Sequence, residues 1–135
     1  MDKQNGISLI ELLIVIAVVG ILASIAYPGY REQLKQSART EVVGLLFESA
    51  QQLERHYARA GQYSDSETVV TPLMNGTAHY TLQAVRDEES FTLLARRRPA
   101  GLMMDDACAD YALDQAGVRS NPGSAGQAPG GCWGG

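Results

Sequence analysis

The pattern of apolar and polar positions divides the first sixty residues into two helical segments of different character. From Ile7 to Ala26 the chain carries one charge, that of Glu11. A helix rises about 1.5 Å per residue, so these residues extend over roughly 30 Å, the thickness of the hydrocarbon core of a bilayer. The pattern therefore predicts a hydrophobic helix over residues 7–27. Because a carboxylate in such a segment costs on the order of 2.5–3.5 kcal/mol, Glu11 is a candidate functional residue.

The second segment, residues 31–60, has the pattern of an amphipathic helix. Its apolar and small positions recur at alternating steps of four and three residues: Leu34, Ala38, Val42, Leu45, Ser49, Leu53 and His56. Gly61 is a suitable C-terminal stop. Between the two segments lie Pro28 and Gly29. Proline removes a helical hydrogen bond and glycine weakens a helix by about 1 kcal/mol. We therefore expect one long helix from Ile7 to Ala60, with a helix break at Pro28 and Gly29.

The remainder of the chain predicts a connecting loop, a sheet and a tail. Residues 61–78 are rich in turn formers, and residues 79–120 contain the β signals, with one hairpin over 79–85 and 90–96 and a second over 108–113 and 118–120. Residues 121–135 are rich in Gly, Pro, Ser and Ala. The expected fold class is α+β, with a long N-terminal helix packed on an antiparallel sheet.

Charge and cysteine content narrow the functional classes. The net charge is −4 and the isoelectric point is near 5.1, which gives no general support for nucleic-acid binding. Two cysteines, Cys108 and Cys132, follow an apolar export-type segment. In an oxidising compartment their expected use is one disulfide, which would hold the tail against the sheet and stabilise it by roughly 3–3.5 kcal/mol.

The N-terminus also resembles a known signal. A short polar leader, residues 1–6, ends in Gly6 and is followed by an apolar helix with Glu11 at its fifth mature position. This arrangement resembles the class III signal of type IV pilins and pseudopilins. The resemblance implies that prepilin peptidase cleaves between Gly6 and Ile7 and methylates the new amine of Ile7, and that Glu11 acts in assembly. Ile7 departs from the family pattern, which usually has Phe, and the leader contains an acid.

The C-terminal pattern is a cysteine, a strand, an Asp-containing turn with Gly, a short strand and Cys-Trp. It resembles that of the minor pilins grouped with PilE. The resemblance implies a minor type IV pilin that contributes to pilus initiation or assembly, and so to twitching motility, attachment or DNA uptake. Its partners would be major and minor pilins and prepilin peptidase. It would be a single-pass inner-membrane protein, with residues 28–135 in the periplasm, before it enters the filament.

Several alternatives stay open on sequence alone. The apolar segment could be a general secretory signal, and a cut after Ala26 would then release a soluble protein. A second hypothesis is that the segment is a simple membrane anchor. A type II secretion pseudopilin shares the pilin signal. A minor pilin for DNA uptake would use the basic run 96–98, although nearby acids make nucleic acid an unlikely partner.

The sequence predicts no enzyme, cofactor or metal site. His56 and His79 lack Cys or acidic neighbours at ligand spacing, so we expect them to be structural residues. We find no phosphate-binding loop and no nucleophile with a local base.

Overall fold

The computed structural model describes residues 3, 5–126 and 130–134, and the chain divides into two compact units, residues 1–34 and residues 35–135. Helix α1 spans Leu9–Ala60 and supplies residues to both units. It ends as expected, because Gly61 adopts a φ of 70° and its N–H bonds the Tyr57 carbonyl at 2.8 Å.

The predicted helix break at Pro28 and Gly29 is wrong as a secondary-structure boundary. Both residues lie inside α1, which is continuous through them. A proline in a helix removes one hydrogen bond and crowds the carbonyl four residues earlier, a penalty of about 3 kcal/mol. The many helix-favouring residues on either side keep the helical conformation despite that local cost. The hydrophobic and amphipathic segments are therefore parts of one helix.

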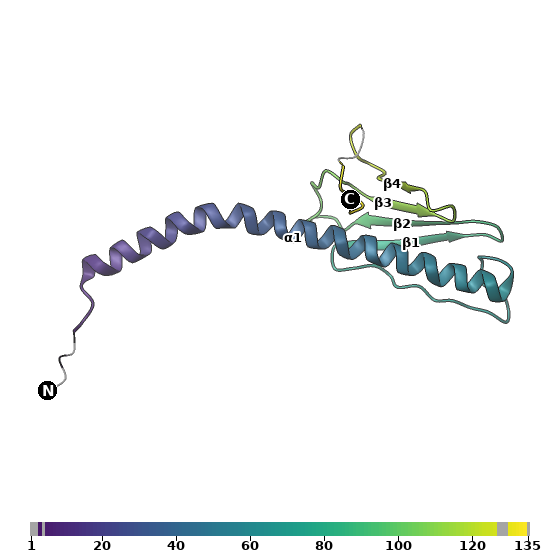
Figure 1. Cartoon of the computed structure of the whole chain (residues 1–135), viewed down its shortest axis with the longest axis horizontal. Coiled ribbons are helices and arrows are strands. Elements are labelled where there is room, and N and C mark those ends of the chain that lie inside the picture. The colour runs from purple at the N-terminus through teal and green to yellow at the C-terminus, as the bar shows by residue number, and fades with distance from the viewer. Residues whose placement is uncertain (1–2, 4, 127–129, 135) are drawn as a thin grey trace. The chain divides into compact units, whose positions relative to one another are not determined.

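The second unit contains one antiparallel sheet in the order β1-β2-β3-β4 (Figure 1). The strands are Tyr80–Arg86, Phe91–Arg97, Tyr111–Asp114 and Arg119–Ser120. The two predicted hairpins are confirmed, with each partner strand following its predecessor. Strand β3 begins later than expected because Ala109 has a φ of 53°, a left-handed conformation that an extended strand does not accommodate.

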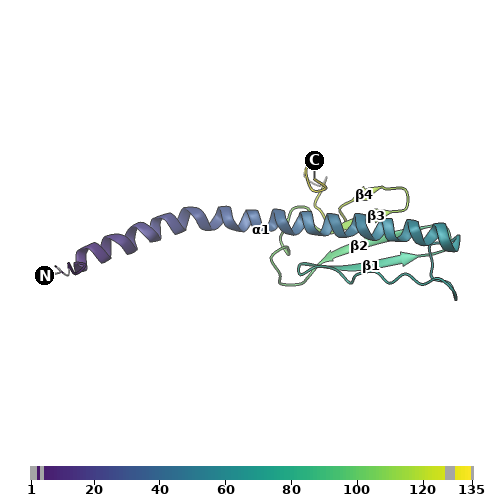
Figure 2. The same cartoon turned by 60° about the horizontal axis from the view of Figure 1, so that its bottom comes forward.

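The core of this unit lies between the sheet and the part of α1 after Lys35, which covers one sheet face (Figure 2). Alternate residues of β2 and β3 point inward, as period-two packing requires. They meet the predicted helix stripe, whose buried members are Ala38, Val42, Leu45, Ser49, Leu53 and His56, and Leu46 is buried beside it. Leu34, which the pattern placed on the stripe, belongs to the first unit and is 39% exposed.

The connecting loop is attached to the sheet at both of its ends. The N–H groups of Tyr63 and Ser64 donate to the carbonyls of Glu88 and Asp87 at 3.1 and 2.8 Å. At the other end Gly76 forms an isolated bridge with Thr81. Gly76 has a φ of 139°, and a Cβ there would lie 2.2 Å from the Tyr80 carbonyl oxygen. Glycine is therefore required at this close approach of two backbones.

Polar groups join the middle of the loop to α1 and β1. His56 is fully buried, and its Nδ1 and Nε2 lie 2.8 Å from Thr71 Oγ1 and 2.9 Å from the Ser64 carbonyl. These contacts give His56 the structural role expected from sequence. Asp65 accepts from the Thr71 N–H at 2.9 Å and pairs with Arg86 at 2.9 Å. The Thr71 N–H, helped by Arg86, lowers the pKa of Asp65.

The predicted disulfide is present between Cys108 and Cys132. It closes a segment with a sequence separation of 24, which in the chain-entropy view removes much of the freedom of the unfolded chain.

Replacing both cysteines by alanine should lower the free energy of unfolding by about 3.5 kcal/mol. Urea unfolding of the full chain in detergent, followed by the fluorescence of the single tryptophan, Trp133, would measure the loss. Reduced wild-type protein is the matched control and should unfold at the same urea concentration as the double variant. A loss below about 1 kcal/mol would contradict this account.

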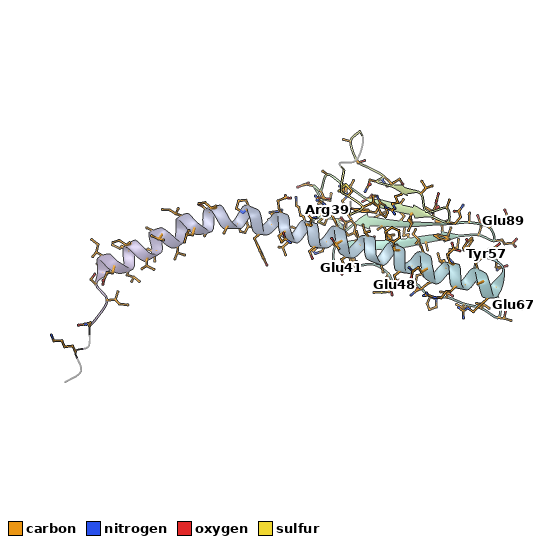
Figure 3. The ribbon with its side chains drawn as sticks, viewed as in Figure 1. Arg39, Glu41, Glu48, Tyr57, Glu67 and Glu89 are labelled. Atoms are coloured by element: carbon orange, nitrogen blue, oxygen red, sulfur yellow. A yellow bond between two sulfur atoms is a disulfide. The ribbon has the colours of Figure 1, made fainter. Side chains whose placement is uncertain are left out.

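Asp65→Asn should reduce stability at neutral pH and make the acid loss of stability shallower. The lowered folded pKa means that the wild-type contribution is complete above the unfolded value, about 3.9, and is lost as the pH falls through the folded value. Urea unfolding at a series of pH values between 7 and 2 would measure how the free energy of unfolding depends on pH. Glu67→Gln changes an exposed carboxylate of the same loop and should keep the wild-type slope (Figure 3). If the free energy of unfolding fell equally steeply with pH in wild type and Asp65→Asn, the assignment of this acid-sensitive stability to Asp65 would be refuted.

Candidate assembly site

The apolar helix begins with a reciprocal cap formed by Ser8 and Glu11. The Ser8 N–H donates to Glu11 Oε2 at 2.8 Å, and the Glu11 N–H donates to Ser8 Oγ at 3.3 Å. This is a capping box, with Ser8 at the N-cap and Glu11 three residues later. The carboxylate thus satisfies an otherwise unpaired backbone donor and fixes the first helical residue as Leu9.

Sequence reasoning singled out Glu11 but missed Ser8. In the uncleaved chain, which has no α-amino group at Ile7, Glu11 has a partner in the backbone of Ser8. The pattern Ser-x-x-Glu before an apolar run was the available signal.

The residues on either side of the predicted cut lie before the helix and are exposed. Gly6 and Ile7 are not part of α1, and Ile7 is 79% exposed. An accessible backbone outside regular secondary structure can be bound by a peptidase, so the geometry is compatible with cleavage there.

The first unit presents an apolar surface without a cover. An 18-residue window of α1 has a mean hydropathy of 2.8, and none of it is buried within the described chain. By length and composition this part of α1 can cross a membrane. Large exposed apolar surfaces mark contact with lipid or with other protein chains.

The C-terminal region is fixed to the sheet and to α1 by an aromatic and polar cluster. Trp133 packs edge-on against Phe47 and Tyr111, and its Nε1 donates to Asn121 Oδ1 at 2.9 Å. The hydroxyl of Tyr111 donates to the Cys132 carbonyl at 3.0 Å. Burial raises the pKa of Tyr111 to about 12, so the phenol remains a donor at neutral pH.

Asn121 and Asp106 complete this attachment, and sequence reasoning missed both roles. Asn121 Nδ2 donates to the carbonyls of Cys108 and Asp110. Asp106 is buried and forms a bidentate ion pair with Arg39 of α1 (Arg39 is labelled in Figure 3). A carboxylate buried so fully requires such a partner. Arg39 and Asp106 are far apart in sequence, so no local pattern predicts their pairing.

The basic run is largely occupied by contacts within the chain. Arg97 donates to Asp110 Oδ1 at 3.0 Å and to the Met104 carbonyl at 2.8 Å. Arg98 donates twice to the Thr77 carbonyl. Arg96 is exposed, on the opposite sheet face from the buried residues of β2. The three arginines therefore do not form one uniform basic surface.

Within the described residues, no group of three or more His, Cys, Asp or Glu side chains could hold a metal ion. Nor do the described contacts bring together a nucleophile, a base and an orienting group of the kind that catalysis requires.

Comparison with known proteins identifies the family that shares this architecture. Residues 1–27 match the family described as prokaryotic N-terminal methylation motif, and residues 28–112 match the family described as type IV minor pilin ComP, DNA uptake sequence receptor. Fimbrial protein Q of Moraxella bovis is 54% identical over 46 residues, which are 34% of this chain and 29% of that protein. The type IV major pilin protein PilE1 of Neisseria gonorrhoeae is 35% identical over 65 residues, 48% of this chain and 39% of that protein.

The chain thus matches less than half the length of these two curated relatives. A type IV pilin of Shewanella oneidensis is 30% identical, with a TM-score of 0.50 over 67% of this chain and 94% of that one. The non-core minor pilin PilV of Neisseria meningitidis, at 22% identity, shares the fold, with a TM-score of 0.55 over 73% of this chain and 96% of that one. The second family match covers more than half of the chain. This chain therefore belongs to the type IV pilins, in the minor pilin family represented by ComP.

Proposed function

We propose that this protein is a minor subunit that enters a type IV pilus by packing its apolar helix among the helices of neighbouring pilins. The observation that carries the proposal is the uncovered apolar part of α1, with the single carboxylate of Glu11 one turn from a candidate cleavage point. Before assembly this segment would lie in the inner membrane as a single span, with residues 28–135 in the periplasm. Within the filament it would exchange lipid contacts for protein contacts.

Cleavage between Gly6 and Ile7 would create an α-amino group at Ile7, and the family pattern implies its methylation. The carboxylate that caps the helix in the isolated chain would then have a second possible partner, the amine of an adjacent subunit. Burying Glu11 with a charged partner avoids the cost of leaving it unpaired in apolar surroundings. Such pairs add little net stability, but they can select one axial register among several.

In this proposal the protein helps to initiate or complete pilus assembly, and so supports twitching motility, attachment or DNA uptake. A pseudopilin of type II secretion is the closest structural alternative, since it would share the apolar helix. The disulfide-closed C-terminal region favours a pilin, because it matches the pattern by which the sequence resembles minor pilins.

Glu11→Ala should leave the chain in the membrane but reduce its amount in sheared pili by about tenfold or more, because the register-selecting charge is lost. Quantitative immunoblots of membranes and pili would measure both pools. Glu11→Gln, which keeps the size without the charge, should behave like Glu11→Ala.

Ser8→Ala is the matched control, because it removes half of the cap but keeps the carboxylate. It should enter pili at close to the wild-type level. Sequencing and mass analysis should find the mature chain beginning at a methylated Ile7. Normal incorporation of Glu11→Ala, or a mature chain beginning at Tyr27, would defeat the proposal.

DNA binding is the second candidate function. The match of residues 28–112 to a family described as a DNA uptake sequence receptor favours it. The net charge of −4 and the internal contacts of Arg97 and Arg98 weigh against a strong electrostatic surface at residues 96–98. The Arg96 side chain is exposed, and it takes no part in the hydrogen bonds that hold Arg97 and Arg98.

The DNA candidate predicts that the full chain in detergent retards duplex DNA at low salt, and that Arg96→Ala weakens binding and lowers the salt slope by about one. Binding titrations at several salt concentrations would measure both quantities. Thr92→Ala, an exposed change on the same strand, is the matched control. Absence of wild-type binding at low salt would remove this candidate.

A further inference from the structure

The apolar part of α1 ends at two exposed tyrosines. Tyr27 and Tyr30 are 66% and 64% exposed, and they follow directly on residues 12–26, which carry no charge. The helix is continuous through Pro28, and the two tyrosines are three residues apart, so their side chains lie on the same face. Each side chain combines an apolar ring with a hydroxyl that can form hydrogen bonds. The end of the apolar surface is therefore marked by two amphipathic groups.

Charged side chains begin again immediately beyond the tyrosines. Arg31 and Glu32 are the first charged residues after Glu11, and both are exposed. Arg31 lies one helical turn after Tyr27, on the same face. An arginine at this level can extend its guanidinium group toward lipid phosphates while its methylene groups contact apolar neighbours. Along this face the helix is first apolar, then aromatic, then charged, which is the order of environments from the hydrocarbon core of a bilayer to its surface.

The backbone at this level also favours a polar environment. Pro28 has no N–H, so the carbonyl of Ser24, four residues earlier, lacks its usual helical donor. The hydroxyl of Ser24 is already used, because it donates to the Ile21 carbonyl at 2.7 Å. A carbonyl without a donor is costly in hydrocarbon, where no water can replace the missing hydrogen bond. Residues 24–28 are therefore better accommodated near headgroups and water than at the centre of a bilayer.

The length of the helix relates the level of the tyrosines to the N-terminal cap. At about 1.5 Å per residue, the chain between Ser8 and Tyr27 extends over roughly 30 Å. The hydrocarbon core of a bilayer has the same thickness, about 30 Å. When Tyr27 lies at one surface of a membrane, the cap formed by Ser8 and Glu11 therefore lies at the other surface. Gly6, which precedes the cap, is then beyond the hydrocarbon.

We propose that Tyr27 and Tyr30 anchor the helix at the periplasmic surface of the inner membrane through contacts with phospholipid headgroups. This inference rests on the proposed function, because it takes residues 7–27 as the membrane span. The two rings lie at the boundary between acyl chains and headgroups, and their hydroxyls donate to headgroup oxygens. Arg31 adds a cation at the level of the phosphates.

Such an anchor determines the depth of the helix in the bilayer. An apolar helix without anchors can slide or tilt to match the local thickness, and each residue of sliding moves it by about 1.5 Å. The tyrosines fix one end of the span at the headgroups. The opposite end, with the bond between Gly6 and Ile7, is then held at the other surface, where a peptidase can reach it. The anchor thus positions the cleavage point from the far side of the membrane.

Bilayers of different thickness test the anchor. The full chain would carry a nitroxide label either at Ile25→Cys, beside the tyrosines, or at Leu9→Cys, at the other end of the span, while the native cysteines stay in their disulfide. Vesicles of dimyristoyl, dioleoyl and dierucoyl phosphatidylcholine supply three thicknesses, and accessibility to oxygen and to a nickel chelate measures the depth of each label. We expect the label at position 25 to keep its distance from the headgroups within about 1.5 Å, one residue of sliding, in all three bilayers. The label at position 9 should take up the mismatch.

Tyr27→Ala with Tyr30→Ala removes the anchor. The label at position 25 should then move by about 3 Å or more between the thinnest and the thickest bilayer, because both ends share the mismatch. Tyr27→Trp with Tyr30→Trp supplies another interfacial aromatic residue and should restore the constant depth. Tyr57→Ala is the matched control, because it removes an exposed tyrosine of the second unit, and it should leave both labels at their wild-type depths.

The outcomes separate the anchor from the membrane span itself. If the chain floats with the vesicles but the double alanine variant keeps the wild-type depth in every bilayer, the inference fails while the proposed function stands. A wild-type label at position 25 that lies near the bilayer centre would overturn the inference in the same way. If the unmodified chain does not float with the vesicles, the membrane stage of the proposed function and the inference fail together.

Discussion

The packing of one helical stripe against one face of the sheet determines the second unit. Val42, Leu46 and Leu53 are fully buried there, against Leu93 and Tyr111 of the central strands. Burying a large aliphatic side chain contributes about 1.5–3 kcal/mol, so this layer supplies most of the favourable free energy of the fold. The loop, the disulfide and the tail are placed by their attachment to this layer.

Around that core, the position of each irregular segment depends on a few polar groups. His56 and Arg86 hold the connecting loop, Arg39 with Asp106 holds the segment before the disulfide, and Asn121 holds the tail. Each satisfies buried backbone or charged groups that would otherwise cost free energy.

The sequence predicted the elements with strong periodicity and failed where tertiary contacts decide. The helix stripe, both hairpins and the Cys108–Cys132 bond follow from local patterns and from cysteine number. The break at Pro28 was wrong because the cost of one proline is small against the helix-favouring sequence on both sides. The Arg39–Asp106 pair and the role of Asn121 arise from residues brought together by folding, so no local pattern could reveal them. Ser8 was predictable from the Ser-x-x-Glu spacing.

The close approach at Gly76 has a consequence for how this surface can diversify. Any side chain there would displace the backbone of the adjacent strand, since the space is filled by the Tyr80 carbonyl. A substitution at this one position would shift the edge of the sheet, whereas an exposed loop residue such as Val70 meets no such backbone constraint. We infer that Gly76 is a fixed pivot, about which the exposed loop surface can be altered without refolding the domain.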